Sequence, residues 1–254
     1  MKKIICITLI LTTCILLAFQ QSANAQKKDS THTLKNTIHF NLTNPMIFGD
    51  GSIIFGYERV LNKRRSFTIN IGSTAFPSLD IIDADSIKAH SIRDNVGFHI
   101  SVDYRFYLAK ENKFVAPRGI YLAPYYSFNN FKNNRSWAVK STNGGPVQEV
   151  NSELRLNIHT LGAELGYQFV FWDRLSVDMI LLGPGIAAYS LKASFGTNLS
   201  EADKQKLLEK INEGLAEKFP GYSRVLDDTE FKTTGVKNTT SFGYRYLVQV
   251  GFRF

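Results

Sequence analysis

Cysteine is almost absent from this chain, and its two copies, Cys6 and Cys14, both lie close to the N-terminus. Because the rest of the chain has none, it can form neither a disulfide framework nor a thiolate metal site. After residue 25 the chain also lacks any run of about 18 consecutive apolar residues, the length that a membrane-spanning helix needs. These absences exclude a disulfide-stabilised secreted scaffold and a helical membrane protein.

The one strongly apolar stretch is at the N-terminus. Two lysines at positions 2–3 precede an almost wholly apolar stretch at 4–19, and Ala-Asn-Ala at 23–25 is a small-x-small cleavage site. This order is typical of a secretory signal peptide. We therefore expect residues 1–25 to be cleaved and residues 26–35 to form a short periplasmic N-terminal segment.

A lipoprotein signal is the competing interpretation of the same stretch. It would need a small residue directly before the lipidated cysteine, whereas Thr13 precedes Cys14 and apolar residues follow it. A signal peptide that is cleaved without lipidation is therefore the prediction, and it exports the mature chain to the cell envelope.

Positive charge exceeds negative charge in this chain. The formal net charge is +8, and removal of Lys2 and Lys3 with the signal leaves 8 − 2 = +6. Nucleic acid is not an expected partner of an exported protein, whereas outer-membrane lipids and anionic lipopolysaccharide are. The alternative is that these lysines and arginines only keep surface loops solvated.

Strict alternation of apolar and polar residues dominates the mature chain. In NVGFHISVDYRFYL, from residue 95, every second position is apolar, and the positions between are Gly, His, Ser, Asp and Arg. Strands of soluble proteins are usually about 5 to 6 residues long, whereas a tilted transmembrane strand needs about 9 to 11. The pattern therefore predicts a membrane-spanning strand with one wholly apolar face.

The same period of two recurs along the chain and gives eight predicted strands between residues 36 and 254. The other seven are 36–43, 52–60, 66–74, 119–128, 154–169, 175–181 and 242–254. The parity inverts inside the sixth strand, between residues 158 and 161, and Gly-Pro-Gly at 183–185 interrupts the seventh. Bulges or kinks explain both breaks, and a segment that has already left the lipid explains the first equally well.

Connection lengths predict the topology. The links at 62–65, 110–117 and 172–173 are short, and the links between them in chain order are longer. Short periplasmic turns alternating with longer outer loops are typical of outer-membrane barrels, and an even strand number places both termini in the periplasm. The prediction is an all-β fold: an eight-stranded, antiparallel, up-and-down transmembrane β-barrel over residues 36–254.

The longest outer loop contains the one good helix prediction, at about residues 198–220. Ser200 is a suitable N-cap, and Leu207, Ile211 and Leu215 follow at helical spacing. We expect this extracellular helix to cap the mouth of the barrel, although its apolar face could also lie on the membrane surface or on a partner. Asn-Gly-Gly at 143–145 predicts a hairpin turn between strand extensions.

The chain ends FGYRYLVQVGFRF, with Phe252 and Phe254 at the third-last and last positions. This ending resembles the C-terminal assembly signal of outer-membrane barrels, which implies the barrel assembly machinery as a partner during biogenesis. More widely, KNTIHFNLTNPMIFGDGSIIFGYERVLNKRRSFTINIG, VDYRFYL, RGIYLAPYY and the closing GFRF resemble small, functionally uncharacterised outer-membrane β-barrel families of Gram-negative bacteria, with an OmpA/OmpX-like eight-stranded architecture. The resemblance implies the fold and the outer-membrane location, and it transfers no catalytic residue.

The polar face of these strands carries charges of both signs, which this register places in the lumen. They are Glu58, Asp103, Arg105, Glu164, Asp178, Arg245 and Arg253, with His39 and His99. Eight strands enclose an interior just wide enough for side chains to fill. The simplest expectation is a paired structural network, because an unpaired buried charge is costly. A gated narrow pore or a ligand pocket is the alternative.

Catalysis has one local candidate, His159 with Ser152 or Glu153 near the outer end of the sixth strand. A lipid A-modifying outer-membrane enzyme would need such a nucleophile and base in contact. We predict no catalytic, cofactor-binding or metal-binding residues, since no glycine-rich phosphate loop and no metal-type histidine spacing is present.

A soluble periplasmic barrel of the lipocalin kind is a further alternative. Such a barrel buries its apolar face inward, whereas here the polar parity has the composition of a lumen. The prediction is therefore a monomeric integral outer-membrane protein with a structural or surface-recognition role, whose outer loops would bind any extracellular ligand. A narrow passive channel, and then a lipid A-modifying enzyme, are the alternatives.

Overall fold

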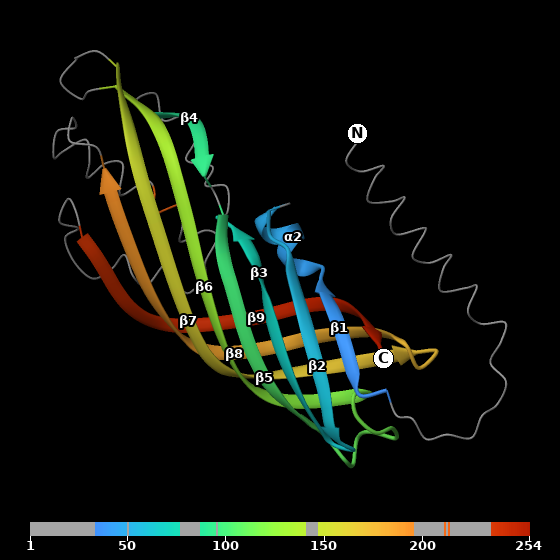
Figure 1. Cartoon of the computed structure of the whole chain (residues 1–254). Helices are drawn as coiled ribbons and strands as arrows, with labels where there is room; N and C mark the ends of the chain where they lie inside the picture. The colour runs from blue at the N-terminus through green and yellow to red at the C-terminus, as the bar shows by residue number, and fades with distance from the viewer. Residues whose placement is uncertain are drawn as a thin grey trace, which may run out of the picture. The chain divides into compact units, whose positions relative to one another are not determined.

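An antiparallel β-sheet makes up most of the computed structural model, which describes residues 34–49, 51–76, 87–94, 96–140, 147–195, 211, 213 and 235–254 (Figure 1). Its strands are β1 (Asn36–Asn41), β2 (Ile54–Asn62), β3 (Arg65–Ala75), β4 (Ile87–Asp94), β5 (Val96–Tyr107), β6 (Gly119–Lys140), β7 (Val147–Phe171), β8 (Leu175–Phe195) and β9 (Gly235–Arg253). One short helix, α2 (Thr43–Phe48), joins β1 to β2. All eight predicted strands are present, whereas β4 and α2 were not predicted.

Eight of the strands close into a ring. Their order around it is β1, β2, β3, β5, β6, β7, β8 and β9, and β9 pairs again with β1. Every neighbouring pair is antiparallel. Closure pairs the edges that an open sheet would leave exposed. The structure confirms the predicted all-β, up-and-down arrangement of eight strands.

The ninth strand, β4, continues the line of β5 along β6. Both strands are antiparallel to β6, and β4 pairs with it from residue 134 to 139, beyond the β5 pairs at 121–130. Two register shifts interrupt the β4–β6 pairing. The second part of the long predicted link between the third and fourth strands is therefore strand rather than loop.

The ring has a turn end and a loop end. At the turn end, residues 63–64, 108–118 and 172–174 connect β2 to β3, β5 to β6 and β7 to β8. Trp172 and Asp173 both have positive φ, 49° and 61°, and the Arg174 amide donates to the Phe171 carbonyl at 3.1 Å. This geometry is a type I′ turn, whose twist matches that of the paired strands.

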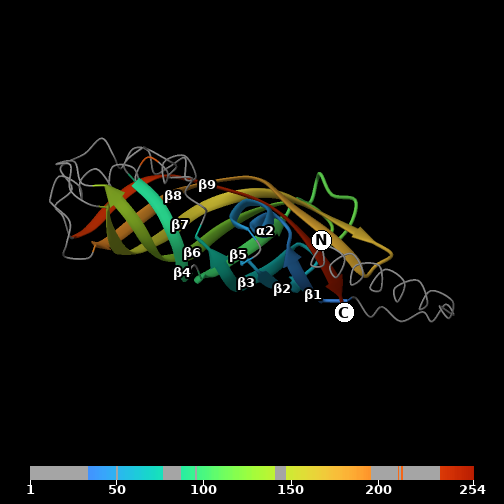
Figure 2. The same ribbon diagram turned by 90° about the horizontal axis from the view of Figure 1, so that it is seen from above.

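The strands differ greatly in length. β6, β7, β8 and β9 have 22, 25, 21 and 19 residues, whereas β1, β2 and β3 have 6, 9 and 11. The long strands continue past the short ones at the loop end, as Figure 1 and Figure 2 both show. β6 and β7 stay paired as far as Lys140 and Val147, so extensions flank the predicted turn at 143–145.

The predicted parity inversion in the sixth strand is not a bulge. β6 and β7 pair without a register shift over their full common length. Leu156 and Ile158 face inward together with Thr160 and Glu164. The interior thus changes from polar to apolar along one regular strand. The break in the seventh strand is a true irregularity, with a register shift against β9 between Ile180 and Gly183.

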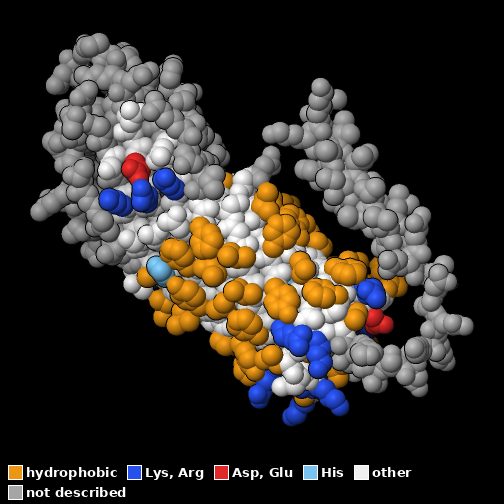
Figure 3. All heavy atoms as spheres, viewed as in Figure 1, with side chains coloured by type: hydrophobic (Ala, Val, Ile, Leu, Met, Phe, Trp, Pro, Cys, Tyr) orange, Lys and Arg blue, Asp and Glu red, His pale blue; other side chains and the backbone are white. Residues whose placement is uncertain are grey.

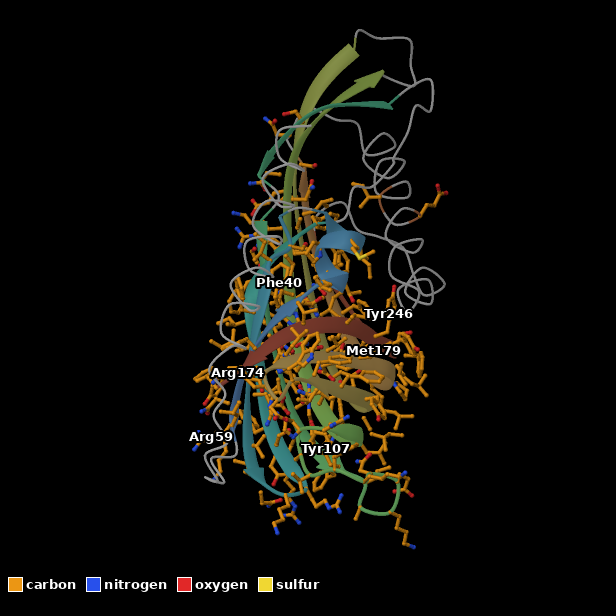
Figure 4. The ribbon with its side chains drawn as sticks, turned by 90° about the vertical axis from the view of Figure 1, so that its right-hand side faces the viewer. Phe40, Arg59, Tyr107, Arg174, Met179 and Tyr246 are labelled. Carbon is orange, nitrogen blue, oxygen red and sulfur yellow. The ribbon has the colours of Figure 1, made fainter. Side chains whose placement is uncertain are left out.

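In the half of the ring nearer the turn end, side chains alternate along each strand between a polar inside and an apolar outside. Figure 3 shows apolar side chains over much of the face in view, and Figure 4 labels Met179 on β8 and Tyr246 on β9. The exposed ones on β9 are Phe242, Tyr244, Tyr246 and Phe252, at 50–56% exposure. We call this outer surface the apolar belt.

Several predicted features lie outside the described residues: the signal peptide at 1–25, most of the segment at 26–35, the turn at 143–145 and most of the helix at 198–220. Within that last range Ile211 and Glu213 are described and helical, and Ile211 is fully buried. In the part of the chain that the structure describes, no helix is both long enough and apolar enough to cross a membrane.

Candidate functional site

Arg105 of β5 is the centre of a charged cluster inside the ring. Its guanidinium is fully buried and is surrounded by three carboxylates. Nε lies 2.7 Å from Asp103 Oδ1, Nη2 lies 2.9 Å from Asp178 Oδ2, and Nη1 lies 3.8 Å from Glu58 Oε1. These acids come from β5, β8 and β2, so one cation links strands on different sides of the ring. We call this group the lower cluster, where lower means nearer the turn end and upper means nearer the loop end.

Four further polar side chains surround the Glu58 carboxylate. Ser66 Oγ donates to Oε1 at 2.6 Å, and Gln168 Nε2 donates to Oε2 at 2.9 Å. The Tyr107 hydroxyl lies 3.1 Å from Oε1, and His39 Nε2 lies 3.2 Å from Oε2. All these groups are buried. A buried carboxylate is tolerated when it has hydrogen-bond donors and a counter-charge, and Glu58 has both.

Aromatic rings fill the space between the charges because glycines face them. The Arg105 guanidinium carbon lies 4.5 Å from the Tyr121 ring centroid, and the Tyr121 hydroxyl donates to Asp178 Oδ1 at 2.8 Å. A Cβ built on Gly166 would lie 2.3 Å from Cζ of Tyr121. The inward glycine therefore makes room for the ring that supports Arg105.

A second group, the upper cluster, lies around Arg245 of β9. Arg245 Nη1 is 3.2 Å from Glu164 Oε2, and its guanidinium carbon lies 5.2 Å from the Tyr125 ring centroid. Arg245 Nη2 also donates to Ser101 Oγ at 3.4 Å. His99 approaches the same Ser101 hydroxyl, with Nε2 at 3.2 Å. Glu164 is buried and Arg245 nearly so, which makes this pair a second cross-strand connection.

Above the upper cluster most of the buried side chains are apolar, although Asn133, Ser136 and Ser152 are buried there too. The buried side chains there include Phe131 of β6, Leu154, Leu156 and Ile158 of β7, and Tyr189 and Leu191 of β8. Phe131 also lies near two other rings, 5.6 Å from that of Phe48 in α2 and 6.3 Å from that of Phe76. The described interior therefore has two charged clusters nearer the turn end and a mainly apolar core nearer the loop end.

The nine charged and histidine residues predicted to lie in the lumen fall into three groups. The lower cluster contains Glu58, Asp103, Arg105 and Asp178, with His39 on Glu58, and the upper cluster contains Glu164, Arg245 and His99. Arg253 has other partners. It lies at the turn end and donates to the backbone carbonyls of Asp173 and Leu34 at 2.9 and 2.8 Å.

Six contributors were missing from the predicted set. Ser66, Tyr107, Tyr121 and Gln168 belong to the lower cluster, and Ser101 and Tyr125 belong to the upper one. Their positions on the polar parity of the strands are visible in the sequence. A tyrosine or glutamine among glycines and serines on that parity is the signal that could have identified them, because a buried hydroxyl or amide needs a partner.

The structure separates the residues of the catalytic candidate. Ser152 is buried inside the ring, whereas His159 is exposed on the outside, where its Nδ1 lies 2.8 Å from the Tyr126 hydroxyl. Glu153 pairs with Arg155 at 2.6 Å. Within the described segments, no group of three or more His, Cys, Asp or Glu side chains is placed to hold a metal ion.

Phe252 and Phe254 both lie on the outside at the turn end, 53% and 46% exposed. The backbone N–H of Asn36 donates to the Phe254 carbonyl at 3.1 Å, so Phe254 is bonded to the first strand, β1, where the ring closes. Fold and interior together define a closed eight-stranded antiparallel ring with charges paired inside and apolar side chains outside. The chain matches no protein-family model, no curated protein and no solved structure.

Proposed function

We propose that this protein is an integral outer-membrane β-barrel with a side-chain-filled interior and a structural or surface-recognition role through its outer loops. The apolar belt is the observation that carries the proposal. It contains more than twenty large apolar side chains that are at least 38% exposed. A soluble monomer rarely exposes so large a contiguous apolar surface.

The height of the belt fits a membrane. On β9 it runs from Phe252 to Phe242, ten residues, which is about 33 Å along the strand at roughly 3.3 Å per residue. With a tilt of about 40°, this corresponds to a band about 25 Å tall, the height of the apolar band of outer-membrane barrels. Aromatic residues at both limits suit the two membrane interfaces.

The polar interior opposes the soluble alternative. A lipocalin-like barrel would place its apolar side chains inside, whereas here Glu58, Asp103, Arg105 and Asp178 are inside. The same residues favour a filled barrel over an open one, because their paired side chains occupy the lumen. The turn end would lie in the periplasm and the loop end outside the cell. Loops on a rigid support are where binding residues concentrate.

Refolding into lipid combined with planar-bilayer recording tests this proposal. The folded protein should migrate differently in gels before and after boiling, and it should show no discrete conductance. Stable channels that Arg245→Ser or Glu164→Gln widens or abolishes would instead make the lumen a pore and reject the filled barrel. Failure to enter lipid would reject the membrane assignment itself.

A further inference from the structure

Nine lysines and arginines lie around the turn end of the ring. One directly precedes β1, two lie on the turn-end parts of β2 and β3, and six lie in the three links of this end. Seven of the nine are exposed, and Arg64 and Arg118 are half-buried. We call this group the cation collar, and its members are Lys35, Arg59, Lys63, Arg64, Arg65, Lys110, Lys113, Arg118 and Arg174.

Acidic groups are fewer at this end. The described residues on its outside include two acids, Glu111 and Asp173, and the C-terminal carboxylate of Phe254 is a third anion. Arg253 is left out of the collar, because its guanidinium is bound to backbone carbonyls. Nine cations and three anions leave a charge of 9 − 3 = +6. A surface with such an excess attracts anions.

Backbone hydrogen bonds fix the collar on the ring. Four of its members have a backbone carbonyl that accepts a hydrogen bond from an N–H group of another segment, at 2.7 to 3.0 Å. These four are Lys35, Lys63, Arg64 and Arg174. The cations therefore extend from hydrogen-bonded turns and strand ends, which keeps them at one end of the barrel.

Three collar arginines lie against aromatic rings on the outside of the turn end. The rings are 41–53% exposed, so the guanidinium groups lie beside the outer surface of the barrel rather than under its interior. Cation–π contacts of this kind occur within about 6 Å of a ring centroid. The distances from guanidinium carbon to ring centroid are 5.8 Å for Arg174 and Phe252, 5.7 Å for Arg65 and Phe106, and 3.6 Å for Arg118 and Phe114.

The height of the collar fits the headgroup layer of a membrane. Phe106 and Phe252 are belt residues near its turn-end limit, and the paired guanidinium groups lie within 5.8 Å of their rings. A headgroup layer is about 5 to 8 Å thick on each side of the hydrocarbon core. Lys and Arg side chains can place an apolar stem on the belt and the charge among headgroups. Figure 3 shows Lys and Arg side chains at the turn end directly next to apolar ones.

We propose that the cation collar binds anionic phospholipid headgroups, of the phosphatidylglycerol class, in the leaflet around the turn end. With the turn end in the periplasm, this is the inner leaflet. Phosphate oxygens accept charge-assisted hydrogen bonds from arginine and lysine, and the acyl chains continue onto the apolar belt. The collar is spread from β1 to the β7–β8 link, which suits a leaflet that surrounds the barrel better than a protein that covers one side. The inference rests on the proposed membrane insertion.

Native mass spectrometry of the full-length refolded protein tests this inference. The protein is refolded in detergent with equal amounts of phosphatidylglycerol and phosphatidylcholine, whose phosphate is balanced by an ammonium group. The parent protein should retain phosphatidylglycerol preferentially. R65Q/R174Q should lower this preference about tenfold, because each cation at an anionic lipid surface strengthens binding severalfold. R65K/R174K keeps both charges and should keep most of the preference.

The matched control is R155Q/K192Q, which removes two exposed cations at the loop end and should leave the preference unchanged. Three results overturn the proposal while leaving membrane insertion intact: a parent protein without the preference, an unchanged preference in R65Q/R174Q, or an equal loss in the loop-end control. Displacement of phosphatidylglycerol by millimolar glycerol phosphate would also overturn it and assign the collar to soluble phosphates.

An anionic cell-wall polymer is the other occupant that the test separates. A parent protein that shows no lipid preference but cosediments with purified peptidoglycan would assign the collar to that polymer and overturn the proposal. Gel mobility of the same samples before and after boiling reports insertion separately. A protein that never enters lipid would overturn both this inference and the proposed function.

Discussion

Arg105 and Asp178 form an ion pair inside the ring, with 2.9 Å between Nη2 and Oδ2, although their strands β5 and β8 are not neighbours. Two strands, β6 and β7, lie between them around the shorter arc. Tyr121 of β6 contacts both partners, since its ring faces the guanidinium and its hydroxyl donates to the carboxylate. The lower cluster therefore ties the ring together by contacts additional to the strand ladders.

Removal of a charge from the lower cluster should destabilise the protein strongly. Asp178→Ala leaves Arg105 buried with fewer counter-charges, which should lower the free energy of unfolding by about 3 to 5 kcal/mol. Arg105→Ala should have a larger effect, because it leaves three buried carboxylates without their shared cation. Urea titration of the protein in lipid vesicles measures both effects.

The control for these variants is Glu111→Ala, which removes an exposed acid at the turn end. A substitution of this kind usually changes stability by less than about 0.5 kcal/mol. If Asp178→Ala were as mild as Glu111→Ala, the lower cluster would contribute nothing to the fold, and its interpretation as a structural network would be wrong.

Gly166→Ala should disturb the lower cluster through Tyr121. The new methyl group would lie 2.3 Å from the Tyr121 ring, so the ring must move away from Arg105 and Asp178. A double-mutant cycle with Tyr121→Leu measures this contact. We expect the loss of stability from Gly166→Ala to be clearly smaller in the Tyr121→Leu background, because the smaller side chain leaves room. Additive effects of the two substitutions would contradict this account.

Arginine substitutions on the outside should depend on depth. Val248 of β9 lies near the middle of the apolar belt, and Phe252 lies at its turn-end limit. In a membrane, Val248→Arg should cost about 2 to 4 kcal/mol, and Phe252→Arg about 0 to 1 kcal/mol. Unfolding titrations in lipid vesicles provide the comparison. Equal costs at the two depths would be evidence against a lipid environment.

The faces of the strands were predictable because the side-chain period of a strand is two, whatever the neighbouring strands are. Residues 96–106 illustrate this, since each apolar position from Phe98 to Phe106 lies outside and each polar one from His99 to Arg105 lies inside. Parity alone therefore identified the buried charges. It could not show that residues 154–158 stay in register. A β-bulge and a change of the interior from polar to apolar produce the same sequence pattern.

Partners across the ring were not predictable from parity. Which inward residues share a height depends on the stagger between strands, and that is a property of the closed ring. For this reason parity grouped Arg253 with Arg105. In the structure, the Arg253 guanidinium instead donates hydrogen bonds to backbone carbonyls at the turn end. β4 also escaped prediction, because IKAHSIRD lacks clean alternation and its pairing with β6 contains register shifts.

The C-terminal aromatics should matter for assembly in cells more than for folding in the test tube. Phe254→Ala removes an exposed side chain, so refolding of the purified protein should change little. If Phe252 and Phe254 act as an assembly signal, the amount of folded protein in the outer-membrane fraction should fall severalfold. Phe242→Ala, an exposed aromatic at the other limit of the belt, is the matched control. An equal decrease in both variants would argue against a signal at the C-terminus.

Membrane insertion is the central claim, and single-cysteine labelling tests it most directly. With Cys6 and Cys14 replaced by serine, the chain has no other cysteine, so one can be placed at Arg155 or at Tyr246. Both positions are about half exposed in the structure, 51% for the Arg155 side chain and 54% for Tyr246. In lipid vesicles, a membrane-impermeant maleimide should label position 155 rapidly and position 246 hardly at all until urea unfolds the protein. Rapid labelling at both positions before unfolding would contradict the account, because it would show that water covers the apolar belt.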